Sequence, residues 1–224
     1  MRGLNGHQGQ VDALDAALAE AGEAHGDKLV MLVSFQKEES VLVEAAARVA
    51  PQTRFVTIDT GVLFEETLAT WREFEERYGI SIAVEDATGD WTGPDNCCSD
   101  AKVAALGRAL DGADAWVTGI RRDQSPTRAG AETVEHDESR GIVKYNPLAH
   151  WTEDDLWAVI HAKELPYNEL HDQGYDSIGC MPCTAPGKGR EGRWAGTDKL
   201  ECGIHTQPAS SAGTGVVTVR PAAA

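Results

Sequence analysis

Five cysteines carry the clearest chemical signal in this chain of 224 residues. Cys97 and Cys98 are adjacent, Cys180 and Cys183 form a CxxC pair, and Cys202 stands alone. An odd number argues against a framework of disulfides, whereas four thiolates at one place can ligate zinc or an iron–sulfur cluster. Structural zinc usually takes two CxxC-like pairs, so the adjacent cysteines favour a cluster and make zinc the weaker alternative. Five unrelated buried cysteines would have to match this pattern by chance.

The fifth cysteine lies in residues 201–205, whose sequence is ECGIH. A nearby cation would favour the thiolate form of Cys202, which is the nucleophile, and His205 or basic residues upstream are candidates for that cation. An incidental cysteine is the alternative. Lys102 follows Cys98 by four residues, so a helix that begins at the cysteine pair would direct its ammonium group toward the ligands. A solvated surface lysine is the competing interpretation.

Basic residues gather in two short segments of an otherwise acidic chain. There are 20 Lys and Arg against 36 Asp and Glu, for a net charge of −16. The two segments are GIRRDQSPTR, with Arg121, Arg122 and Arg128, and GKGREGRW, with Lys188, Arg190 and Arg193. Guanidinium groups bind phosphate or sulfate through paired hydrogen bonds, so we expect an anion pocket built from these segments. Solvated loops are the alternative interpretation.

Composition excludes several classes of protein. A net charge of −16 disfavours binding to nucleic acids or anionic membranes, because their phosphates would repel most of the surface. No apolar run approaches the roughly 20 residues that cross a bilayer, and the first ten residues lack the apolar segment of a secretory leader. We therefore expect a cytoplasmic protein with one domain over 1–205. Its nucleotide-binding core would span 28–165, its cluster and catalytic segment 166–205, and a disordered tail 206–224.

Helical and strand patterns alternate along the chain. Helices are predicted over 10–24, 41–50, 64–79, 97–110 and from Thr152 onward, and strands over 28–33, 54–59, 80–86 and 115–120. Residues 121–141 are predicted to form a long loop or hairpin. The alternation predicts an α/β fold with a doubly wound, mostly parallel sheet, whose ligands bind at the carboxyl edge.

Two of these strands end in segments that would reach that edge. The first is followed by SFQKEES, residues 34–40, where a helix start would present backbone amides to a phosphate. This segment has no glycine and is weak evidence alone. The second strand is followed by Thr60 and Leu63.

Several motifs together resemble the iron–sulfur branch of the phosphoadenylyl/adenylyl-sulfate reductase family. They are SFQKEES, IDTGVLFEET, CCSDAK, TGIRRDQSPTR, NPLAHWTEDDLW, GCMPC and ECGIH, and they span about residues 28–205. The resemblance implies an adenine-nucleotide α-hydrolase-like fold, shared with ATP pyrophosphatases. The phosphate loop of those enzymes is SGGKDS, whereas this chain has SFQKEES, which suggests a pocket that does not hold a triphosphate.

The resemblance also implies a reaction. Cys97, Cys98, Cys180 and Cys183 would bind a [4Fe-4S] cluster, Cys202 would be the nucleophile, Lys102 would lie between cluster and substrate, and His205 would assist catalysis. The substrate-binding candidates are Ser34, Thr60, Leu63, Arg121, Arg122, Arg128, Arg190 and Arg193. Members with four cluster cysteines generally reduce adenosine 5′-phosphosulfate to sulfite and AMP, with thioredoxin or a glutaredoxin-like dithiol as reductant, in sulfate assimilation toward cysteine. Members that lack those cysteines generally use the 3′-phosphorylated substrate, and the family often forms homo-oligomers.

Two other classes of function remain open from the sequence. An ATP-pyrophosphatase-type enzyme, such as a cluster-bearing tRNA thiolase, predicts a glycine-rich phosphate loop and usually a basic surface. A non-catalytic zinc or iron–sulfur module predicts that Cys202 is dispensable and that no nucleotide binds.

Overall fold

A computed structural model describes residues 4, 6–88, 100–194 and 201. Its centre is one sheet in the order β3-β2-β1-β4-β6-β5. The strands are β1 (Leu29–Leu32), β2 (Arg54–Asp59), β3 (Ile82–Asp86), β4 (Ala115–Val117), β5 (Val134–Asp137) and β6 (Ile142–Tyr145). Neighbouring strands are parallel except for the β5–β6 pair at one edge. The predicted α/β fold with a mostly parallel sheet is confirmed.

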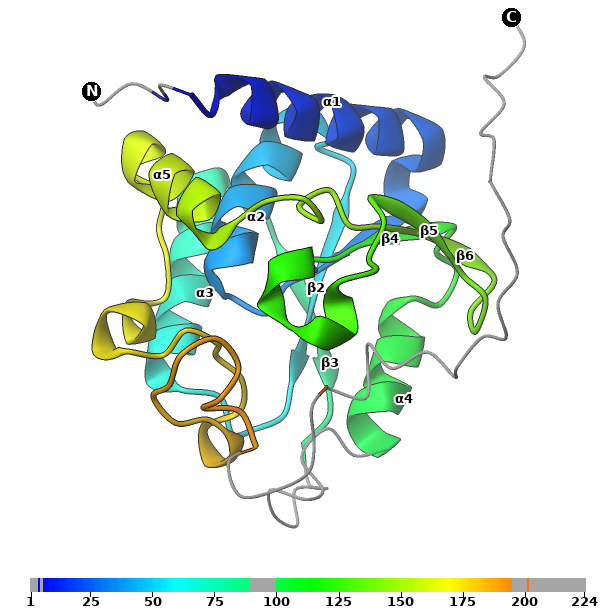
Figure 1. Cartoon of the computed structure of the whole chain (residues 1–224). Coiled ribbons are helices and arrows are strands. Elements are labelled where there is room, and N and C mark those ends of the chain that lie inside the picture. The colour runs from blue at the N-terminus through cyan, green and yellow to red at the C-terminus, as the bar shows by residue number, and fades with distance from the viewer. Residues whose placement is uncertain (1–3, 5, 89–99, 195–200, 202–224) are drawn as a thin grey trace, which may run out of the picture.

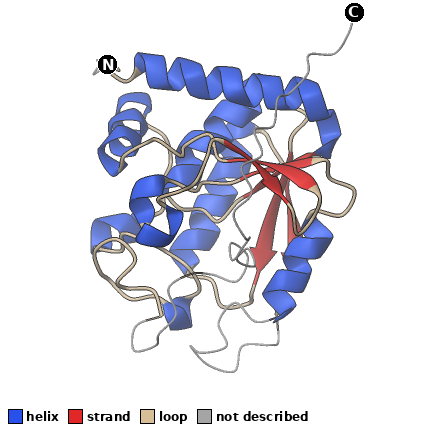
Figure 2. Cartoon of the chain, turned by 45° about the vertical axis from the view of Figure 1, so that its right-hand side comes forward, coloured by secondary structure: helices blue, strands red, loops and turns tan. Residues whose placement is uncertain are grey.

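Helices cover both faces of the sheet (Figures 1 and 2). They are α1 (Gln8–His25), α2 (Lys37–Val49), α3 (Glu65–Tyr78), α4 (Asp100–Ala109) and α5 (Glu153–Lys163). Leu29 and Met31 of β1 belong to the core that contains buried residues of α1, α2, α3 and α5, whereas Val30 and Leu32 join the core of α4. Alternate residues of β1 therefore enter opposite cores, which is why this strand is apolar without interruption.

Several local predictions are confirmed. Helix α1 buries Val11, Leu14 and Leu18 as its periodicity predicts. Helix α3 ends at Gly79, whose φ of 63° is the left-handed conformation that glycine adopts without steric cost. Helix α5 begins with a capping box in which the Thr152 hydroxyl accepts a hydrogen bond from the amide of Asp155.

The segment after β4 contains more structure than the sequence predicts. Two 3₁₀ turns, Arg122–Gln124 and Pro126–Arg128, lead into the β5–β6 hairpin. The hairpin was one of the two alternatives predicted for residues 121–141, but β6 as a strand was missed. Both strands are four residues long and carry charged side chains, so no apolar periodicity marks them. Buried Lys144 is paired with Glu135 across the hairpin, 3.2 Å from Nζ to Oε2.

Two further predictions concern residues that lie partly or wholly outside the described region. The described part of helix α4 begins at Asp100, and residues 97–99, where the sequence predicts the helix to start, lie outside the described residues. The predicted tail, 206–224, also lies outside them. Among the described helices, none is long and apolar enough to cross a membrane.

The strand order creates a switch point between β1 and β4. The chain runs from β1 outward through β2 to β3, and then continues on the other side of β1 with β4. Loops that leave neighbouring strands toward opposite sides leave a crevice at the carboxyl ends, which is where ligands bind in open α/β sheets.

Candidate active site

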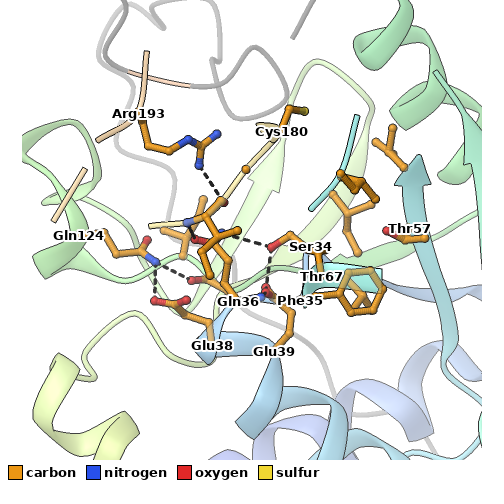
Figure 3. A pocket seen from close by; sticks show the side chains of 18 of the residues that line it. Ser34, Phe35, Gln36, Glu38, Glu39, Thr57, Thr67, Gln124, Cys180 and Arg193 are labelled. Atoms are coloured by element: carbon orange, nitrogen blue, oxygen red, sulfur yellow. Dashed lines mark hydrogen bonds between the residues drawn. The ribbon is translucent and has the colours of Figure 1, made fainter. Parts of the chain in front are cut away.

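A cavity of about 110 Å³ lies at this switch point (Figure 3). It is lined by the loop after β1 and the start of α2, by the end of β2, and by Gly119 and Ile120 after β4. Residues 178–180 and the arginines that follow them close another side. Segments distant in the sequence thus meet at one edge of the sheet, as expected for a nucleotide site in this fold class.

The loop after β1 makes a sharp turn at Phe35. This residue has a φ of 59°, in the left-handed region where a side chain is rarely tolerated. Its buried ring stacks on Trp71, with ring centroids 5.5 Å apart, and also contacts Phe74. Aromatic packing therefore holds a backbone conformation that a glycine would adopt more readily.

Four backbone amides at the start of α2 have acceptors within the chain, so they are not available to the phosphate that the sequence predicts there. The amide of Gln36 donates to Glu39 Oε2 at 3.0 Å, and the amide of Lys37 donates to His171 Nε2 at 3.2 Å. The amides of Glu39 and Ser40 donate to the Gln36 carbonyl. The side chain of Glu39, which reaches back over the helix start, thus accepts a hydrogen bond that a ligand would otherwise accept.

Two adjacent buried glutamates lie beneath the cavity and differ in charge state. Burial opposes ionisation of Glu38, but the charges of Arg121 and Lys37 outweigh it and hold the Glu38 pKa below its usual value. Burial, and then the negative charge of Glu38, raise the pKa of Glu39 to about 8. The Ser34 hydroxyl donates to Glu39 Oε2 at 2.8 Å. At neutral pH, therefore, Glu38 is charged and Glu39 is protonated.

Four cationic side chains line the cavity: Lys102, Arg128, Arg190 and Arg193. Arg193 is buried; its Nη1 donates to the Ile178 carbonyl at 3.0 Å, and its guanidinium lies over Trp194, 4.5 Å from the ring centroid. Cations that are held within a poorly hydrated cavity stabilise negative charge more strongly than cations on an open surface. The cavity can thus bind an anion.

Two of these cations bind a carboxylate from the ECGIH segment. Arg128 donates from Nε and Nη2 to the two carboxylate oxygens of Glu201, at 2.8 Å each. Arg190 Nη2 donates to Glu201 Oε1 at 2.7 Å. Glu201, the one described residue of that segment, is thus bound to two side chains of the cavity wall.

Three predicted substrate-binding residues do not line this cavity. Arg121 is buried in ion pairs with Glu38 and Asp123, beside a smaller neighbouring cavity. Arg122 donates to the Ala131 carbonyl and pairs with Glu132. The guanidinium groups of Arg121 and Arg122 are thus hydrogen-bonded to acceptors away from the cavity. Of the three arginines in the GIRRDQSPTR segment, only Arg128 lines the cavity. The Thr60 hydroxyl instead contacts Cys180, 3.2 Å from oxygen to sulfur.

Ser34 and Leu63, two of the predicted substrate-binding residues, line the cavity, and so does Lys102 at the start of α4. Sequence reasoning missed two glutamines. Gln124 donates to Glu38 Oε1 at 2.9 Å, and Gln36 accepts from the amide of Ile178 at 2.8 Å. Gln36 lies in SFQKEES and Gln124 in GIRRDQSPTR, two segments that the sequence analysis selected as candidate anion-binding sites. A neutral glutamine among charged residues shows no pattern that predicts a functional role.

The CxxC pair forms one wall of the site. Cys180 lines the cavity and Cys183 ends a 3₁₀ turn, and both side chains are buried beside Trp194 and Val62. Cys180 is a free thiol, whereas Cys183 forms a disulfide in this structure. With that disulfide reduced, the two sheltered sulfur atoms on one compact turn fit the donor set of an iron–sulfur cluster. Cys97, Cys98, Cys202 and His205 lie outside the described residues, so the described part of the chain holds only half of the predicted ligands.

Comparison with known proteins decides the family. A family model described as the phosphoadenosine phosphosulfate reductase domain matches residues 28–186, well over half of the chain. The chain belongs to this family. The predicted resemblance to phosphoadenylyl/adenylyl-sulfate reductases is thereby confirmed.

Individual relatives of the phosphosulfate reductase family agree with this assignment. The chain is 45% identical to an adenosine 5′-phosphosulfate reductase of Bacillus pumilus, over 81% of this chain and 85% of that protein. It is 42% identical to a phosphoadenosine 5′-phosphosulfate reductase of Gloeobacter violaceus, over 86% and 88%. A solved phosphoadenylyl-sulfate reductase from Candida auris, in complex with phosphate, matches with a TM-score of 0.63 and 25% identity, over 75% and 88%. The predicted adenine-nucleotide α-hydrolase-like fold is confirmed.

Proposed function

We propose that this protein is an adenosine 5′-phosphosulfate reductase. One observation carries the proposal: several groups suited to this chemistry line a single cavity at the switch point. They are Lys102, three arginines and Cys180 of the CxxC pair, and Glu201 is bound at the wall of the cavity. This arrangement suits an anionic nucleotide attacked by the cysteine that follows Glu201. The identity to reductases of this substrate supports the assignment.

The reaction follows from the chemistry of a thiolate and a sulfuryl group. The Cys202 thiolate attacks the sulfur of the substrate, and the sulfur–oxygen bond to the phosphate breaks, so AMP leaves with the bonding electron pair. The product is a cysteine S-sulfonate on the enzyme. A dithiol then attacks the Cys202 sulfur, and sulfite leaves with the electron pair of the sulfur–sulfur bond. The second thiol of the donor resolves the mixed disulfide, so the donor supplies both electrons as it becomes a disulfide.

The cations of the cavity stabilise the leaving group. Negative charge grows on the phosphate oxygen as the sulfur–oxygen bond breaks, and Lys102 and Arg193 line the cavity in which that charge develops. Removing one such donor typically costs about 3 kcal/mol of transition-state stabilisation. We expect both residues to act on the transition state more than on the bound substrate.

The cluster belongs to the same proposal. Cys180 and Cys183 would hold a [4Fe-4S] cluster together with Cys97 and Cys98. When bound, such a cluster would help to position the substrate and to polarise it. The side chain at the wall of the cavity is that of Cys180, and the Thr60 hydroxyl lies within hydrogen-bonding distance of its sulfur. A hydrogen bond to a ligating sulfur tunes such a site.

The choice of substrate within the family is also part of the proposal. Relatives at similar identity include reductases named for adenosine 5′-phosphosulfate and one named for the 3′-phosphorylated form. The four cluster cysteines favour the former. Turnover of the two nucleotides side by side, with a thioredoxin system and anaerobically purified protein, tests the choice. Faster sulfite release from adenosine 5′-phosphosulfate supports it, and faster release from the other nucleotide would contradict it.

An ATP-pyrophosphatase-type activity finds no support in the loop after β1. That activity needs a glycine-rich loop to hold a triphosphate, whereas here buried Phe35 occupies the turn and the amides of Gln36 and Lys37 already have acceptors.

The proposal further includes thioredoxin or a glutaredoxin-like dithiol as donor, a role in cysteine synthesis, a cytoplasmic location, a homo-oligomeric state and a single reductase domain over 1–205. His205 would assist catalysis.

A further inference from the structure

Lys37 is a buried lysine that binds the chain itself and does not line the switch-point cavity. It begins α2 within SFQKEES, at a place where the lysine of a phosphate loop would reach a phosphate. Its side chain is only 3% exposed, and Nζ donates to the Asp176 carbonyl at 2.6 Å and pairs with Glu153 Oε1 at 3.0 Å. The ammonium group therefore contacts the segment that precedes the CxxC pair.

The residues around Lys37 hold the same segment. The Lys37 amide donates to His171 Nε2 at 3.2 Å, so the proton of this imidazole is on Nδ1, which donates to the Tyr175 carbonyl at 2.7 Å. Gln36 Oε1 accepts from the Ile178 amide at 2.8 Å. Residues 175–178, the anchored segment, are thus tied to the start of α2 by the lysine, by the glutamine and through the histidine.

The anchored segment leads directly to the CxxC pair. Only Gly179 separates Ile178 from Cys180, and consecutive Cα atoms lie about 3.8 Å apart. On the other side of Cys180, the Met181 amide donates to the Val62 carbonyl at 2.8 Å. Cys180 is therefore held between one anchor at the start of α2 and a second anchor in the loop after β2.

The anchored segment also holds a cation of the cavity. Arg193 Nη1 donates to the Ile178 carbonyl at 3.0 Å and to the Ser177 hydroxyl at 3.3 Å. Asp176 Oδ2 accepts from the amide of Gly189 at 2.8 Å, in the loop that continues to Arg193. A displacement of this segment would therefore move both a wall cysteine and an arginine of the cavity.

We propose that Lys37 is a positioning residue, which fastens the anchored segment onto α2 and so holds Cys180 and Arg193 at the cavity. The inference rests on the proposed function, which gives the cysteine and the arginine their roles. A charged ammonium group is costly to bury unless it is paired, so the lysine keeps its acceptors in place. Lys37→Met, which keeps the apolar stem and removes the amine, should loosen the anchored segment.

Hydrogen–deuterium exchange of the anaerobically purified, full-length protein tests the proposal. In Lys37→Met we expect the amides of 175–181 to exchange about tenfold faster, while those of β1 and α1 change little. A chelator should also remove iron several-fold faster than from the wild type, because Cys180 is less firmly held. The exchange experiment needs no turnover. Absence of iron or of sulfite release in the wild type would refute the proposed function, and the exchange rates would still decide the role of Lys37.

Two control variants separate the effect of Lys37 from that of other ion pairs. Lys163→Met removes a partly buried pair with Glu44, 2.7 Å from Nζ to Oε2, that also joins α5 and α2, and should leave the exchange of 175–181 unchanged. Glu153→Gln keeps an acceptor for Lys37 and should have little effect, because the Glu153 side chain is 40% exposed. If Lys37→Met does not fold, Lys37→Gln, which removes the same charge, replaces it with the same expectations.

Three results would overturn the proposal. Unchanged exchange over 175–181, or an equal rise throughout the chain together with a lower melting temperature, would mean that Lys37 does not position this segment in particular. Weaker AMP binding with unchanged exchange would mean that Lys37 binds the nucleotide itself. An equal rise over 175–181 in Lys163→Met would mean that the effect belongs to the packing of α2 on α5.

Discussion

Gly119 and Glu39 meet so closely that the site leaves no room for a side chain between them. A Cβ atom at position 119 would lie 2.6 Å from Glu39 Oε1 and 2.8 Å from the Cβ of Glu38. The loop after β4 thus packs directly on the two buried glutamates that begin α2. This close approach brings the two loops of the switch point together at the cavity.

Gly119→Ala should therefore disturb the site as well as the fold. The added methyl group must push the start of α2 away, and such overpacking typically costs about 1–3 kcal/mol. We expect a lower free energy of unfolding in urea and weaker binding of AMP. Gly130→Ala, at a position where a Cβ meets nothing within 4 Å, is the matched control. Equal stability and AMP affinity in the two variants would contradict the packing described here.

The protonated Glu39 predicts an unusual pH dependence of stability. Its pKa is about 8 in the folded protein and near its ordinary value of 4.5 when unfolded, so between these values the folded state binds more protons. The stability that this group contributes is thus fully present below about pH 4.5 and is lost as the pH rises toward 8. Glu39→Gln, which keeps a neutral acceptor, should flatten this decline and raise the melting temperature near pH 8. An unchanged pH profile would show that Glu39 is ionised in the native protein.

Arg121 is predicted to be structural. Its guanidinium pairs with Glu38, 3.0 Å from Nη2 to Oε1, and both side chains are buried. Removing one partner of a buried pair typically costs about 3–5 kcal/mol, because a charge remains without compensation. Arg121→Met should lower the free energy of unfolding by that order. Arg122→Ala, whose pair with Glu132 is partly exposed, should change it by less than about 1 kcal/mol. Similar losses in both variants would contradict the assignment.

Cys180 is predicted to be a cluster ligand. Cys180→Ser should lose iron and sulfide from anaerobically purified protein, together with the visible absorbance of the cluster, because serine replaces a thiolate that iron prefers. Thr60→Val, which removes the hydroxyl beside the Cys180 sulfur, should keep the iron. Unchanged iron content in Cys180→Ser would remove this residue from the ligand set.

The sequence alone predicts four of the six strands and several residues that line the cavity, because burial on two faces and charge in an acidic chain leave visible patterns. Val30 and Met31 enter opposite cores, and the apolar run that contains them marks β1. Arg121 and Arg128 belong to the same basic segment, yet only Arg128 reaches the cavity. Their difference comes from acceptors on other segments, Glu38 for Arg121 and Glu201 for Arg128, which no local pattern reveals. The left-handed turn at Phe35 could not be predicted from the sequence either, because it is stabilised by packing of the ring on Trp71 and Phe74.

Nucleophilic attack by Cys202 is the central claim, and intact-protein mass spectrometry tests it most directly. Wild-type enzyme is mixed with adenosine 5′-phosphosulfate without any thiol donor, and the mass of the protein is followed together with the release of AMP. We predict that one sulfonate group is added to each chain, at Cys202, with one equivalent of AMP, and that Cys202→Ser gives neither. AMP and sulfite release without a covalent adduct, or an adduct that survives in Cys202→Ser, would contradict the account.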